Sequence, residues 1–185
     1  LQAEKFQDKD VLEAFKESQN RVISMALIHE ELYKGEGTYT LNFSAYLKKL
    51  AENLFQTYSL KSKNIHLSMD LEDACFDMDI AVPLGIIVSE LVSNALKHAF
   101  SGKEKGEIRI RLCREAKDNE KNKSTFSLKI SDNGKGIPEN LKLEGFKFLG
   151  LKLVNILTDQ LDGKLELNKT EGTEFRITFN VVENS

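Results

Sequence analysis

Two runs in which apolar and polar residues alternate constrain the fold of this chain most strongly. The first spans residues 106–116 and places Ile108, Ile110 and Leu112 at every second position. The second spans residues 125–131, and a short polar connector separates it from the first. Such alternation predicts strands with one buried and one solvated face, joined here as a long antiparallel hairpin.

Helical periodicity lies on both sides of this hairpin. Helices are predicted over residues 10–34, 42–58 and 149–161, and another begins at a capping Asp79 and carries residues 90–100. Further strands are predicted over residues 65–71, 74–78, 164–170 and 173–181. Because the helices segregate from mostly antiparallel strands, the predicted class is α+β, a two-layer sandwich with a mixed sheet, preceded by a helical stalk.

The first predicted helix carries a heptad seam, and Asp10 can cap its start. The seam positions step by alternating fours and threes: Val11, Phe15, Ser18, Val22, Met25, His29 and Leu32. This spacing predicts that the helix packs along another helix at a shallow angle.

Composition and charge argue against two classes of partner. The formal net charge is −3 and no long basic run exists, which argues against nucleic acid. No apolar run reaches the roughly 18 residues of a membrane span, so no direct membrane contact is expected of this segment. Cys75 and Cys113 lie in strand-like runs without metal-ligand spacing, so we expect buried free thiols and a cytoplasmic location. The chain begins at Leu1 rather than Met, and we expect it to be part of a longer protein.

The stretch "ELVSNALKHAF", residues 90–100, interleaves polar groups with a buried helical face. Glu90, Asn94 and Lys97 step by four and three, and His98 follows Asn94 by four. An acid, an amide oxygen and a cation along one helix edge suit a hydrated Mg²⁺ ion on a polyphosphate. An ordinary solvated helix edge with side-chain pairs explains the same pattern, and this helix alone does not decide between them.

The loop "DNGKGIP", residues 132–138, follows the second strand of the hairpin. A carboxylate at Asp132 needs a hydrogen-bond donor if it is buried, and the amine of a base can be that donor. Gly134 and Gly136 would let the backbone approach a flat ligand, although Asn-Gly is also a common turn signal. Neither the Walker phosphate loop nor a G-x-G-x-x-G turn is present in the sequence.

Taken together with "FLGLKLV" and "TEGTEF", these two stretches resemble the ATP-binding domain of sensor histidine kinases. That domain has the Bergerat fold of the superfamily shared with gyrase, MutL and heat-shock chaperones. The resemblance covers about residues 60–182, and "RVISMALIHEELY" resembles the second helix of the dimerisation and phosphotransfer hairpin in one histidine kinase subgroup. It implies a helical remnant over residues 1–58 and an ATP-binding catalytic domain over residues 59–185.

The resemblance also implies roles for individual residues. Glu90 would orient the attacking nucleophile or a metal-bound water, Asn94 would bind Mg²⁺, and Lys97 and His98 would contact phosphates. The turn before the last helix would approach the phosphates through Leu149, Gly150 and Leu151. The remaining ATP-binding positions surround the base, with Asp132 accepting from the adenine amino group: Asp132, Gly134, Gly136, Ile137, Gly172 and Thr173.

The implied reaction is transfer of the γ-phosphoryl group of ATP to a histidine, and later to the receiver domain of a response regulator. The intact protein would be a homodimer through its helical hairpin, with or without a membrane tether. His29 is predicted to be a seam residue rather than the phosphoacceptor, which would lie upstream of Leu1. Many histidine kinases have two glycines where this chain has Gly150, so closure over the phosphates would rest on a lid at about residues 139–148. An anti-sigma-type serine kinase and a nucleotide-binding scaffold without transfer activity remain alternatives.

Overall fold

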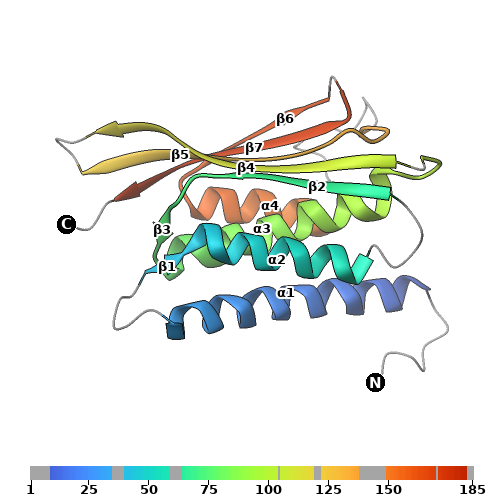
Figure 1. The fold of residues 1–185 in the computed structure, drawn as a ribbon, viewed down its shortest axis with the longest axis horizontal. Helices are drawn as coiled ribbons and strands as arrows, with labels where there is room; N and C mark the ends of the chain where they lie inside the picture. The colour runs from blue at the N-terminus through green and yellow to red at the C-terminus, as the bar shows by residue number, and fades with distance from the viewer. Residues whose placement is uncertain are drawn as a thin grey trace.

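The computed structural model describes residues 9–34, 40–58, 64–103, 105–118, 122–137, 149–169 and 171–182. The predicted lid at residues 139–148 and the glycines expected to end the first helix, Gly35 and Gly37, lie outside these residues. A five-stranded sheet forms one layer and helices α2, α3 and α4 cover one of its faces, while α1 lies on the far side of α2 and α3 (Figure 1). The structure thus confirms the predicted two-layer α+β class and adds a helix beyond the second layer.

The helices begin and end close to the predicted positions. They are α1 (Lys9–Lys34), α2 (Phe43–Tyr58), α3 (Met78–Asn94) and α4 (Leu149–Gln160). Asn42 caps α2, since its Oδ1 accepts from the backbone N of Ala45 at 2.9 Å. The predicted cap at Asp79 is wrong: Asp77 caps α3, with its Oδ1 accepting from the backbone N of Ile80 at 3.1 Å. Helix α1 is described from Lys9, one residue before the predicted start at Asp10.

The sheet has the strand order β2-β4-β5-β7-β6. Its strands are β2 (Asn64–Leu71), β4 (Lys105–Asp118), β5 (Lys123–Asp132), β6 (Lys164–Asn168) and β7 (Thr173–Val182). Only the β2–β4 pair is parallel among these neighbours. Strands β4 and β5 form the predicted hairpin, with Ile110 opposite Ile130. The short strands β1 (Leu41–Asn42) and β3 (Cys75–Phe76) pair separately.

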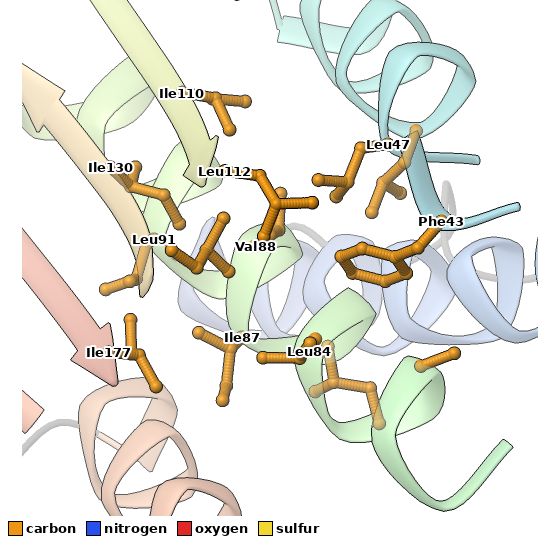
Figure 2. Close-up of a cluster of buried hydrophobic side chains, with 14 of the residues drawn as sticks. Phe43, Leu47, Leu84, Ile87, Val88, Leu91, Ile110, Leu112, Ile130 and Ile177 are labelled. Carbon is orange, nitrogen blue, oxygen red and sulfur yellow. The ribbon is translucent and has the colours of Figure 1, made fainter. Parts of the chain in front are cut away.

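The core fills the space between the sheet and the helices. Figure 2 shows Ile87, Val88 and Leu91 of α3 among side chains from α2 and from the strands. The strand side chains in this cluster are Ile110, Leu112, Ile130 and Ile177, all nearly inaccessible to solvent. Helix α3 and the turn after it, Met78–Ala99, are long and apolar enough to cross a membrane by composition alone. Because 72% of that window is buried inside the fold, we interpret α3 as the core helix.

Three residues of the heptad seam of α1 are largely exposed. Phe15, Val22 and Met25 expose 50%, 65% and 47% of their surface, whereas Ser24 and Ile28 on another face are completely buried. The inward face of α1 is therefore partly polar. The Ser24 carbonyl accepts from the Tyr46 hydroxyl of α2 at 3.3 Å.

The two cysteines are free, as predicted, but they are not buried. Cys75 is exposed on β3, and Cys113 is half-buried on the open face of β4. Their strands are correctly located, but each side chain lies on the face away from the core. His66 is exposed on the edge strand β2.

Candidate nucleotide-binding site

Glu90 lies on the last part of α3, and its carboxylate is almost fully enclosed. The residue is 5% exposed, although carboxylates are rarely buried without a partner. Its partner is Arg21 of α1, whose Nε lies 2.6 Å from Oε1 of Glu90. The second carboxylate oxygen, Oε2, faces Gly150 at the start of α4. Glu90 thus lies between a stalk helix and the beginning of the last helix.

Gly150 packs against both acidic and amide groups of α3. A Cβ atom on Gly150 would overlap Oε2 of Glu90 and would lie 3.8 Å from Nδ2 of Asn94. Glycine therefore allows the start of α4 to approach α3 this closely. The predicted site residues Glu90, Asn94 and Gly150 meet at one place, although they are up to 60 residues apart in sequence.

Helix α3 does not continue with α-helical geometry beyond Asn94. Residues Ala95–Ala99 form a π-helical turn. A π turn is wider than an α turn. Lys97 therefore does not keep the position around the helix axis, in line with Glu90 and Asn94, that regular α-helical spacing predicts. The Nζ atom of Lys97 lies 5.7 Å from the ring centroid of Tyr58, the last residue of α2, and His98 is exposed.

Asp132 ends strand β5 and points toward the helical layer. It is opposite Ile108 in β4 and Thr173 in β7, and directly paired residues share a face of the sheet. Asp132 is 9% exposed, and its Oδ1 accepts from the backbone N of Gly134 at 2.8 Å. Burial raises the pKa of Asp132, while the Gly134 N–H, the Thr173 side chain and the Lys103 charge act in the opposite direction.

The loop after Asp132 is held against the end of the π turn and against the β6–β7 turn. The backbone N of Lys135 donates to the Ala99 carbonyl at 2.9 Å. Gly172 has a φ of +88°, and a Cβ there would overlap the Asp132 carbonyl oxygen. Asp132, Gly134, Gly136, Gly172 and Thr173 therefore form a second group of predicted site residues beside the same π turn.

The other predicted residues contribute differently. Leu151 is 8% exposed and belongs to the core, and Ile137 is half-buried against it. Leu149 is the first residue of α4, and its side chain lies outside the described part of the structure.

Sequence reasoning missed Arg21, Tyr58 and Lys103. A second helical stripe in α1, formed by Asn20, Ser24 and Ile28, could have indicated that a polar face of α1 is buried.

A hollow opens beside Asp132 on the opposite, open face of the sheet. It is lined by Glu107, Arg109, Ser131, Asp132, Asn133, Asn168, Glu171 and Glu174. Three glutamates against one arginine disfavour an anionic ligand there. The helical side, where Gly134 and Gly172 pack closely around the end of β5, is the better candidate for a nucleotide.

The fold is that of a histidine-kinase-type ATP-binding domain. The chain belongs to the histidine kinase-, DNA gyrase B- and HSP90-like ATPase family, whose model matches residues 79–183. A second family model, described as histidine kinase, matches residues 1–58. These matches confirm the resemblance inferred from the motifs.

Two named relatives cover much of the chain. It is 30% identical over 170 residues to the sensor histidine kinase PdtaS of Mycolicibacterium smegmatis, covering 91% of this chain and 32% of the relative. It is 27% identical over 156 residues to blue-light-activated histidine kinase 2 of Erythrobacter litoralis, covering 82% and 42%. The chain thus spans well under half the length of these relatives.

Solved structures share the fold. The histidine kinase domain of the Erythrobacter litoralis EL346 blue-light-activated kinase superposes with a TM-score of 0.76 at 23% identity, over 88% of this chain and 74% of that one. The Acinetobacter baumannii histidine kinase AdeS gives a TM-score of 0.61 at 19% identity, over 95% and 82%.

Proposed function

We propose that this chain is the catalytic part of a sensor histidine kinase, which binds Mg-ATP and transfers the γ-phosphoryl group to a histidine outside the chain. The observation that carries this proposal is the meeting of Glu90, Asn94 and Gly150 on one side of the π turn, with Asp132 and Thr173 on the other. The first group offers an acid and an amide where phosphates would lie, and the second offers a buried acceptor for a base.

The donor groups fit a magnesium ion that arrives with a polyphosphate. No cluster of three or more His, Cys, Asp or Glu side chains that could hold a metal ion occurs in the described ranges. The described residues therefore do not suit a metal site in which protein side chains supply all the ligands. Mg²⁺ usually keeps several waters and takes one or two protein oxygens, and Asn94 beside Glu90 supplies that number. When bound, Mg-ATP would supply the phosphoryl group and the charge that neutralises it.

The chain's own residues would position the reactants. Glu90 would accept a hydrogen bond from the attacking imidazole and orient its nitrogen. As the new N–P bond forms, the bond from the γ-phosphorus to the β–γ bridging oxygen breaks and ADP leaves. Asp132 would accept from the base amine, and the start of α4 would approach the phosphates, where a helix N-terminus favours negative charge. Phosphoryl transfer depends mainly on such positioning and charge neutralisation.

We propose three further features of the intact protein. The exposed seam of α1, with Phe15, Val22 and Met25, would pack in a helical hairpin and homodimer. The receiver domain of a response regulator would accept the phosphoryl group, and the reaction would take place in the cytoplasm. The match of residues 1–58 to a histidine kinase model favours this function over the serine kinase alternative.

Nucleotide titration tests the proposal. We expect the chain to bind both Mg-ATP and ADP. We expect Asp132→Ala to reduce the binding free energy of ADP by about 1–3 kcal/mol, because a buried hydrogen-bond partner is lost. Asp70→Ala is the matched control, because it removes another aspartate, whose exposed ion pair with Arg111 lies at the β2 edge of the sheet. Unchanged ADP affinity in Asp132→Ala would place the base elsewhere.

A further inference from the structure

Helix α1 contacts the candidate catalytic carboxylate directly. The side chains of Arg21 and Glu90 are 21% and 6% exposed, and their Nε and Oε1 atoms are 2.6 Å apart. Exposed ion pairs contribute little, but a pair this shielded has lost much of its hydration and depends on accurate geometry. The pair joins a helix of the N-terminal histidine kinase match to a residue of the ATP-binding match.

The neighbouring residue of α1 reaches a second charged group of the site. The Nδ2 atom of Asn20, a residue 4% exposed, donates to the Tyr58 hydroxyl at 2.6 Å. The ring of the same Tyr58 lies 5.7 Å from Nζ of Lys97. Consecutive residues of α1 thus contact Glu90 directly and Lys97 through one aromatic ring.

The two oxygens of Glu90 have different neighbours. Arg21 binds Oε1, while Oε2 is the oxygen that faces Gly150 and lies on the side of Asn94. A guanidinium donating to one carboxylate oxygen fixes the plane of the group and leaves the other oxygen to act.

We propose that Arg21 is a positioning residue for phosphoryl transfer: from helix α1 it holds the Glu90 carboxylate so that Oε2 lies at the start of α4, where the phosphates would approach. This inference rests on the proposed function and adds a requirement to it. The site is catalytically complete only when α1 is docked, so a change in the stalk can alter the rate without touching the nucleotide.

The kinetic test uses autophosphorylation of the intact protein that contains this chain. We expect Arg21→Gln to lower kcat at least tenfold and to change KM for ATP less than twofold. Arg21→Lys should recover part of the rate, because an ammonium can still donate to the carboxylate. Glu90→Gln should be as slow alone as in combination with Arg21→Gln, and Arg111→Gln, which breaks an exposed pair, is the matched control.

Other kinetic outcomes overturn the proposal. A higher kcat in Arg21→Gln would mean that the pair restrains the enzyme. A rise in KM with kcat unchanged would place Arg21 in nucleotide binding, and unchanged kinetics would leave it a structural contact. A wild-type protein that binds ADP but forms no phosphohistidine would overturn both this inference and the phosphotransfer function.

A second measurement does not depend on kinase activity. Urea unfolding of the 185-residue chain with Arg21→Gln, Glu90→Gln and the double change forms a double-mutant cycle. We expect the double variant to be clearly less destabilised than the sum of the single variants. Additive effects would show that the contact is absent in solution, even if nucleotide binds normally. If the effects of the two substitutions were not additive but the chain did not bind ADP, the result would contradict the proposed function and still support the Arg21–Glu90 contact.

Discussion

Gly150 lies against the Glu90 carboxylate with no room for a side chain between them. Replacing Gly150 by Ala puts two effects in opposition. Alanine favours the helix by up to about 1 kcal/mol, while the added methyl group pushes α4 away from α3. We therefore expect Gly150→Ala to bind Mg-ATP about tenfold more weakly, roughly 1.4 kcal/mol, without a matching loss of unfolding free energy.

Calorimetry and urea unfolding on the same samples check this prediction. Asn155→Ala, at an exposed position of α4, is the matched control for changing the same helix. If Gly150→Ala kept wild-type affinity, the start of α4 would not approach the phosphates.

Asn94 separates recognition of the metal from recognition of the base. It lies beside Glu90 and Gly150, whereas Asp132 is on the other side of the π turn. We expect Asn94→Ala to weaken the binding of Mg-ATP about tenfold, or roughly 1.4 kcal/mol, because an oxygen ligand is lost. The affinity for metal-free ADP should stay nearly unchanged. Titrations with and without Mg²⁺ measure both. Equal losses for the two ligands would make Asn94 a structural residue.

The buried Asp132 carboxylate predicts a pH dependence of stability. Burial raises its pKa in the folded protein above the ordinary 3.8. A group whose folded pKa is raised contributes stability below its unfolded pKa, and that contribution is lost as pH rises through the folded pKa. We therefore expect wild type to lose stability relative to Asp132→Asn as pH increases from about 3.8. Urea unfolding of both proteins across this window tests the sign, and a difference that is constant with pH would contradict it.

Periodicity predicted the elements well but not how they contact one another. The β4–β5 hairpin followed from alternating residues such as Ile108 and Ile110, because one face of a strand must be buried. The Arg21–Glu90 pair was not predictable, since it depends on how α1 docks on α3. The seam of α1 was identified from its spacing, yet Phe15, Val22 and Met25 on it are largely exposed, while Asn20, Ser24 and Ile28 on another face are buried.

Local geometry was harder to predict than element type. Two aspartates lie near the start of α3, and Asp77, which precedes the helix, makes the cap rather than Asp79 in its first turn, a shift of two residues that periodicity does not resolve. The π turn at Ala95–Ala99 inserts a wider turn into an unbroken helical pattern, which displaced the predicted position of Lys97. Asp132 is buried at the end of its strand next to glycines, and its contact with a base stays a prediction.

His29 lies on the exposed part of α1, and its neighbours on the seam are the exposed Val22 and Met25. The seam spacing predicts that this face packs against a partner helix in the intact protein, so the imidazole would be directed at that helix rather than at ATP. The site residue that α1 does reach, Glu90, is contacted by Arg21. We therefore expect this chain to bind ATP without forming a phosphohistidine.

Incubation with γ-labelled ATP at neutral pH, followed by acid and base treatment, measures this directly. We expect no acid-labile, base-stable label in the 185-residue chain, and identical behaviour for His29→Gln. His66→Gln is the matched control, because His66 is an exposed histidine on the edge strand β2. Label that forms in the wild-type chain and disappears in His29→Gln, but persists in His66→Gln, would identify His29 as the acceptor and overturn the assignment of α1 as the helix that follows the acceptor.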